Sequence, residues 1–161
     1  MGFSIQVDGM EELLRKMDQL TGKAADVAAL ALYEGAGVVA DAVSRAVDGI
    51  ATEPFKYAAG GRKRKPSPEE KAILHNAKKG VAKFRKNGVS VQTSVGMQNS
   101  GYAELNGKTK PIPQIANAIN SGTSFMNKQP FMRKAFSQSQ NTAQGVIEAG
   151  IMSREKELSI D

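Results

Sequence analysis

The stretch 119–136, INSGTSFMNKQPFMRKAF, carries the strongest local signals in the chain. Its first residue, Ile119, is interpreted as the end of a strand, and the turn Ser121-Gly122-Thr123 follows. Glycine favours such a turn because it adopts positive φ without a steric penalty. Pro130-Phe131 then marks a helix start, since proline fits the first turn of a helix. The stretch therefore predicts a passage from the last strand of a sheet to a closing C-terminal helix.

Two long helices are predicted outside this stretch, over residues 23–50 and about 130–157. The apolar residues of 23–50 fall on two faces of a helix, which indicates burial on more than one side. Gly35 and Gly37 each cost about 1 kcal/mol relative to alanine inside a helix. They indicate a bend or a close backbone approach, and both a kinked core helix and a subunit contact remain open. Gly145 and Gly150 are expected to interrupt the final helix and to fray its end.

Shorter elements precede the long helices or lie between them. Alternation over residues 3–7 predicts a half-buried strand. Asp8 with Glu11, three positions later, fits a capping box and starts an amphipathic helix over 9–20. A second box, Ser67-Pro68-Glu69-Glu70, predicts a helix over 68–79.

The middle of the chain reads as a sheet. Asn87-Gly88 between two extended runs, 81–86 and 89–95, predicts a β-hairpin, with the valine side of the second run facing the core. Residues 101–107 read as a further strand, followed by a loop containing Pro111 and Pro113, while 114–120 fits either a short helix or an extended segment. The fold class is α+β, a small antiparallel sheet packed against a long N-terminal helix and a C-terminal helix, in one domain over 1–161.

Charge is unevenly distributed along the chain. The net charge is +6, with −4 in residues 1–60, +8 in 61–90, +4 in 91–140 and −2 in 141–161. A basic, flexible loop is expected at about 52–67. The candidate contact residues, in this loop and in the hairpin that follows, are all basic: Arg62, Lys63, Arg64, Lys65, Lys83, Arg85 and Lys86. A solvated loop, a phosphate contact and an acidic protein surface all remain open.

The composition excludes the common catalytic sites. There is no cysteine and a single histidine, His75, with no carboxylate or thiol partner at ligand spacing. Phosphate-binding, dinucleotide-binding and nucleophile-elbow motifs are missing too. We therefore expect no enzyme activity, no catalytic or metal-binding residues and no cofactor. No apolar run approaches the 20 residues of a membrane span, so a soluble, cytoplasmic product without a membrane partner is expected.

Four motifs stand in a particular order: VSVQTSVG (89–96), GYAELN (101–106), NAINSGT (117–123) and QPFMRKAF (129–136). This order, with GMEELL (9–14) before a long small-residue helix, resembles the neck or tail-completion (head–tail joining) family of tailed phages. Members usually carry Pro-x-x-Thr-Gly-x-Leu after the long helix, and this chain instead has residues 52–67 and an additional capped helix.

The resemblance implies a virion component, made in the host cytoplasm, that forms a homo-oligomeric ring, expected to be a hexamer, between head-connector and tail proteins. It also implies fold-defining roles. Gly122 and Thr123 would shape the turn after a sheet strand, and Pro130 and Phe131 would pin the final helix to that sheet. The alternatives are a DNA-binding accessory protein without sequence specificity, which would contact packaged DNA through the basic loop, and a tail terminator or minor capsid protein.

Overall fold

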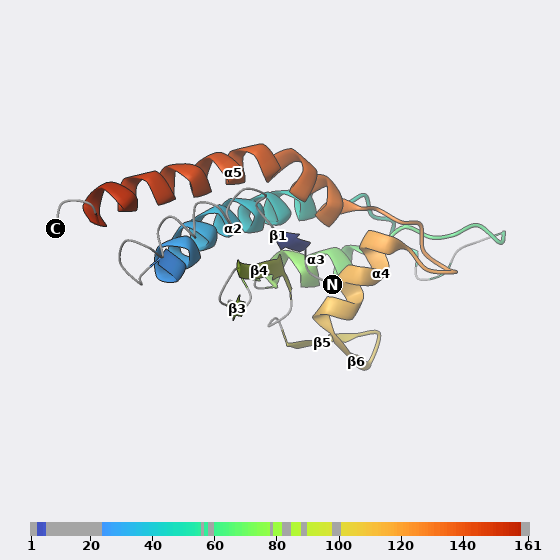
Figure 1. The fold of residues 1–161 in the computed structure, drawn as a ribbon. Helices are drawn as coiled ribbons and strands as arrows, with labels where there is room; N and C mark the ends of the chain where they lie inside the picture. Colours follow the sequence, from blue (N-terminus) through green and yellow to red (C-terminus); the bar gives the residue numbers. More distant parts are fainter. Residues whose placement is uncertain are drawn as a thin grey trace.

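Two long helices run antiparallel along the molecule, α2 (Ala24–Asp48) and α5 (Phe131–Leu158). The computed structural model describes residues 3–5, 24–55, 57, 60–77, 79–81, 85–87, 90–97 and 101–158. Within them α2 is the central element, with α5 against one face and the sheet and α3 (Pro68–Asn76) on the other side (Figure 1). The α+β class and the packing of the long N-terminal helix against the C-terminal helix are confirmed.

The burial of α2 follows from its composition. Small and β-branched residues cover two sides of the helix, and the buried ones include Ala28, Leu32, Val39, Val43 and Val47. Since both α5 and strand β4 pack on it, the expectation of burial on more than one side is confirmed. Gly35 lies directly against Ile147 of α5, which is the close backbone approach predicted for the glycine pair, whereas Gly37 has open space around it.

The main sheet is antiparallel and centred on β4 (Ser90–Gly96). Strands β1 (Phe3–Ile5) and β2 (Gly80–Val81) flank it, and β3 (Arg85–Asn87) also pairs with it. The valine side of β4 is buried, as predicted, at Val91, Thr93 and Val95. The predicted pairing of the two runs is present, but Asn87 pairs with Ser90 and so belongs to the ladder, not to the turn.

A second hairpin occupies the region predicted to be a strand and a proline loop. β5 (Tyr102–Leu105) pairs with β6 (Lys108–Pro111). Asn106 and Gly107, with φ of 55° and 71°, form the two-residue turn between them. This pair of positive φ values is the geometry that Asn-Gly favours in hairpins. The expectation of a loop after residue 107 is therefore wrong.

Helix α4 (Ile112–Ser121) replaces the predicted strand end at Ile119. Its buried apolar residues Ile112, Ile115, Ala116 and Ile119 follow the i, i+3, i+4, i+7 spacing of one helix face. Of the two alternatives for 114–120, the helical one is confirmed. The stretch 119–136 thus joins two helices, and the prediction that it follows a sheet strand is wrong.

Helix boundaries agree elsewhere, with two differences. The capping box that starts α3 is confirmed: Ser67 Oγ accepts from the Glu70 amide at 3.1 Å and Glu70 Oε2 accepts from the Ser67 amide at 2.7 Å. α3 ends at Asn76, before the predicted residue 79. α5 continues unbroken through both of its glycines, so the predicted interruption is wrong. The predicted helix over 9–20, and residues 6 and 7 of the first strand, lie outside the described residues.

One described segment, Asp26–Asp48, is long and apolar enough to cross a membrane by length and composition. The expectation that no apolar run approaches this length is therefore wrong. More than half of the segment is buried inside the structure, and the core helix of a folded domain passes the same test.

Candidate functional site

Two loops project together from the end of the molecule where α2 stops and α5 starts (Figure 1). We call the described residues of 51–66 and 122–129 the arm. It contains the basic run 62–65 and most of the stretch that joins α4 to α5. The arm therefore brings together two regions that lie more than 50 positions apart in the sequence.

Backbone hydrogen bonds hold the two loops side by side. The Arg64 amide donates to the Phe125 carbonyl at 2.8 Å, and the Asn127 amide donates to the Arg64 carbonyl at 2.9 Å. Asn127 Nδ2 adds a bond to the Lys63 carbonyl at 3.2 Å. The basic run is thus paired like a short strand with the second loop.

The base of the arm is fastened by Gln129. Its Oε1 accepts from the Ala51 amide at 2.9 Å and its Nε2 donates to the Ala51 carbonyl at 2.7 Å. The backbone amide of Gln129 donates to the Ile119 carbonyl at 2.7 Å. One side chain therefore joins the first residue of the arm to the end that leads into α5.

Arg64 is bound inside the fold. Its guanidinium donates to both carboxylate oxygens of Glu70, at 2.7 and 2.8 Å, and Glu70 also caps α3. Burial raises the pKa of the Glu70 carboxyl, but hydrogen bonds from Arg64 and Ser67 outweigh burial and hold this pKa below its ordinary value. The hydrogen bonds to the Glu70 carboxylate raise the pKa of the Arg64 guanidinium. Arg64 therefore anchors the arm to α3, and its charge is compensated.

Arg62 is compensated as well, though less tightly. Its Nη2 lies 3.4 Å from Glu53 Oε2, while Glu53 Oε1 accepts from the Lys65 amide at 2.9 Å. The Glu53 amide in turn donates to the Pro66 carbonyl at 2.9 Å. Glu53 thus ties the two sides of the first loop together.

Exposed cations and aromatic rings remain on the arm surface. Lys63, Lys65 and Lys128 are exposed. Phe55, Tyr57 and Phe125 are 63%, 81% and 75% exposed. Three exposed aromatic residues on one projection are unusual for a chain with few aromatic residues, and such patches mark contact surfaces.

The predicted fold-defining residues shape the second loop. Gly122 ends α4 with φ of 77°, and a Cβ there would stand 3.0 Å from Lys128 backbone and side-chain atoms. Thr123 Oγ1 accepts from the amides of Phe125 and Met126 at 3.1 and 3.0 Å. The turn they build therefore follows helix α4, so the expectation that it follows a strand is wrong.

Pro130 and Phe131 start α5 as predicted, but against α2. The Pro130 carbonyl accepts from the Lys134 amide at 3.0 Å, and Phe131 is buried. An Asn120 oxygen from α4 caps the helix by accepting from the Met132 amide at 3.2 Å. Among the described elements the final helix packs mainly on α2 and also contacts β1. The main support of this helix is therefore another helix, and the role of Pro130 and Phe131 in pinning it to the sheet stays a prediction.

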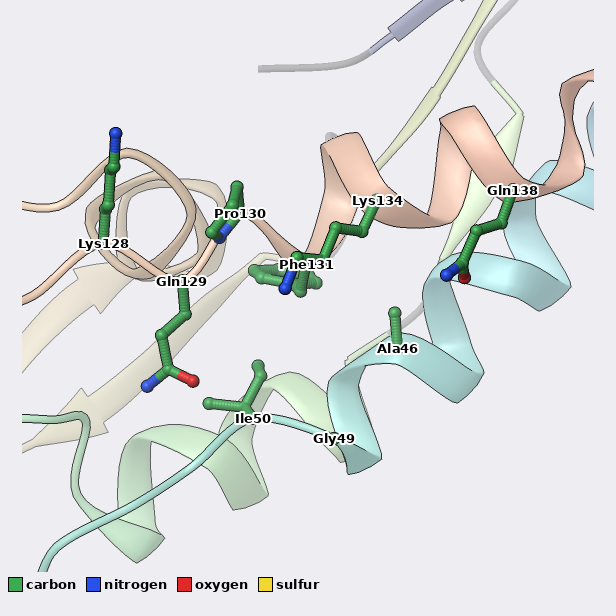
Figure 2. Close-up of a pocket in the computed structure, with 9 residues that line it drawn as sticks. All are labelled: Ala46, Gly49, Ile50, Lys128, Gln129, Pro130, Phe131, Lys134 and Gln138. Carbon is green, nitrogen blue, oxygen red and sulfur yellow. The ribbon is translucent and has the colours of Figure 1, made fainter.

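A half-open cavity of about 310 Å³ lies at the base of the arm (Figure 2). Its lining comes from the end of α2, the start of α5 and the segment before α5: Ala46, Gly49, Ile50, Lys128, Gln129, Pro130, Phe131, Lys134 and Gln138. Figure 2 shows Gln138 extending toward Ala46 and the Gln129 amide beside Ile50. The Gln129 side-chain amide is already hydrogen-bonded to the backbone of Ala51. We therefore describe the cavity as a gap at the junction between the arm and the α2–α5 pair, and not as a binding site.

The remaining predicted contact residues lie on the hairpin. Arg85 and Lys86 are in β3, where the structure describes their backbone, and Lys83 lies outside the described residues. Arg85 and Lys86 belong to the sheet and are not part of the arm as defined above.

His75 has a carboxylate partner, contrary to the sequence-based expectation. Its Nδ1 lies 2.9 Å from Asp48 Oδ1 at the end of α2, and both side chains are exposed. The two residues are 27 positions apart, so local spacing gave no sign of the pair. Among the described residues no three histidine, cysteine, aspartate or glutamate side chains form a metal-binding group.

Sequence reasoning missed the exposed rings of Phe55 and Phe125, the structural use of Glu53 and the pairing of Glu70 with Arg64. The composition of residues 52–67 indicates the first loop of the arm. The pairing of that loop with residues 122–129 has no local signal in the sequence. No protein-family model matches the chain, and comparisons with curated proteins and with solved structures found no match.

Proposed function

We propose that this protein is a structural virion component of a tailed phage or phage-derived particle, which forms a ring at the head–tail junction. The observation that carries the proposal is the arm, a projection held by five named anchors and presenting aromatic rings and lysines outward: Ala51, Glu53, Arg64, Asn127 and Gln129. An ordered projection of this kind suits repeated contact with other proteins, because little conformational entropy is lost on binding.

The motif order described above supports the same function. The residues that carry it fold into β4, the β5–β6 hairpin, α4 and the start of α5, so they are framework residues. The neighbouring head-connector and tail proteins are the further partners in this proposal, and the virion neck or tail is the location.

Electron microscopy of the purified full-length protein tests ring formation directly. We expect closed rings, and light scattering coupled to gel filtration should give a mass that is a fixed multiple of 17.2 kDa, with six copies expected. A monomer at every concentration up to about 100 µM would count against the proposal.

A second candidate, DNA contact without sequence specificity, is favoured by one observation. Lys63, Lys65 and the ring of Tyr57 are all exposed on the first arm loop. Lysines and aromatic rings together suit phosphate contact and base stacking.

Fluorescence anisotropy with a labelled single strand and a labelled duplex tests this candidate. Lys63→Ser with Lys65→Ser should abolish retention if the arm binds DNA. Arg64 must stay in place in this experiment, because its loss would also unfasten the arm from Glu70. Unchanged retention in the double variant would exclude the arm as a DNA site.

A further inference from the structure

The end of the molecule opposite the arm also exposes apolar side chains. Leu30 and Tyr33 of α2 are 53% and 56% exposed, and Met152 of α5 is 61% exposed. α2 begins and α5 ends at this end of the helix pair (Figure 1). Apolar side chains are therefore exposed at both ends of one elongated body.

The exposed side of α2 is acidic around these residues. Asp26, Leu30, Tyr33, Glu34 and Asp41 are exposed at spacings that place them along one side of the helix. Glu34 is paired with Arg154 of α5, whose Nη2 lies 2.6 Å from Glu34 Oε1. The first cation further along α2 itself is Arg45. We call this surface the α2 face.

The arm has the opposite charge. Its carboxylate, Glu53, pairs with Arg62, and Arg64 pairs with Glu70 of α3. Lys63, Lys65 and Lys128 are exposed, and the second arm loop has no acidic residue. The arm and the α2 face therefore match in exposed apolar area, and the exposed lysines of the arm are opposite in charge to Asp41, which lies on the α2 face nearer the end of α2 where the arm starts.

We infer that the arm of one copy docks on the α2 face of the next copy, with Tyr57 and Phe125 against Leu30 and Tyr33 and with Lys63 and Lys65 facing Asp41. This inference rests on the proposed function and specifies its subunit contact. Because the two surfaces differ, the contact is head-to-tail, and repetition closes a ring or extends a filament. Within one chain the contact is excluded, since about 20 helical residues, or about 30 Å, separate Leu30 from the start of the arm.

Charge exchange gives the first test, in sedimentation velocity at about 50 mM salt, where exposed charges act over a longer range than at physiological ionic strength. Lys63→Glu with Lys65→Glu should weaken self-association at least about tenfold. Combining this pair with Asp41→Lys should recover much of the loss. The matched control, Lys108→Glu with Lys110→Glu on exposed strand β6, has the same charge change away from the arm and should assemble like the original protein.

Site-specific crosslinking gives the second test, because the chain has no cysteine of its own. Under mild oxidation, protein carrying both Tyr57→Cys and Leu30→Cys should form a ladder of covalent oligomers, and each single variant should form no ladder. A protein with Tyr102→Cys and Leu30→Cys is the control, since Tyr102 is 72% exposed, close to the 81% of Tyr57, but lies on β5.

The outcomes separate the inference from the proposed function. Rings that persist unchanged in the Lys63 and Lys65 variant, with no ladder from the cysteine pair, would overturn this contact and leave ring formation standing. A wild-type protein that stays monomeric would overturn both. Loss of DNA retention with intact assembly would assign the arm to nucleic acid and overturn the inference.

Discussion

Gly35 sets how closely α2 and α5 approach, and replacing it with alanine tests this contact. A Cβ at Gly35 would overlap Ile147 Cγ1, would stand 2.7 Å from Ile147 Cδ1 and would lie 3.0 Å from the Ala143 carbonyl oxygen. The isoleucine is fully buried and the carbonyl belongs to a helix, so neither can move away easily. Overpacking of this kind costs about 1–3 kcal/mol.

The size of the net effect follows from two opposing terms. Alanine gains about 1 kcal/mol over glycine in a helix interior. At Gly37 a new Cβ meets nothing within 4 Å, so Gly37→Ala should realise that gain. Gly35→Ala should instead lower the free energy of unfolding by up to about 2 kcal/mol, which corresponds to a fall of up to about 4–8 °C in melting temperature for a domain of this size.

Urea denaturation followed by circular dichroism measures both variants under the same conditions. The reasoning is refuted if Gly35→Ala is as stable as Gly37→Ala. A double-mutant cycle adds a stricter check, because Ile147→Ala removes the side-chain atoms that clash. The loss caused by Gly35→Ala should shrink by about 1 kcal/mol or more in that background.

Three further predictions concern polar anchors and a turn. Glu70→Gln should lower the free energy of unfolding by about 2–3 kcal/mol, because it weakens the capping box and leaves Arg64 without its ionic partner. The control variant Glu69→Gln, at an exposed position, should change the free energy of unfolding by less than about 0.5 kcal/mol. Since the folded-state pKa of Glu70 lies below its ordinary value of 4.5, its contribution should be complete above that pH and should disappear as pH falls through the folded-state pKa, as pH-dependent denaturation will show. Asn120→Ala should cost about 1 kcal/mol in urea denaturation by removing the cap of α5. Gly107→Ala should cost about 1 kcal/mol in the same assay, since φ is 71° at that position.

Signals contained within a few consecutive residues, or repeated along one helix, predicted the secondary structure well. The capping box at 67–70 was recognisable because all of its atoms come from four consecutive residues, and the long helices were recognisable from sustained periodicity. Two local signals in the sequence favour the observed structure more strongly than the expectations stated for those segments. Asn106-Gly107 carries the same hairpin preference as Asn87-Gly88, and the isoleucine spacing of α4 is helical even though prolines occur at its start.

The candidate site depended on contacts that no local pattern records. Gln129 bonds to Ala51 across 78 positions, and Asn127 bonds to Lys63 across 64. Residue type gives no sign of the arm surface either, because aromatic residues usually contribute to cores. Phe55 and Phe125 are instead exposed, while Met97 and Met132 are buried.

The four consecutive basic residues at 62–65 look uniform in sequence and divide into two kinds in the fold. Arg64 and Arg62 pair with Glu70 and Glu53, and these pairs fix the shape of the arm. Lys63 and Lys65 face solvent. Replacing all four together would therefore remove the anchor and the surface charge in one step, and a loss of assembly or of DNA retention would have two explanations. Changing only the two lysines alters the surface and keeps the Arg64–Glu70 pair, so any effect on binding can be assigned to the contact itself.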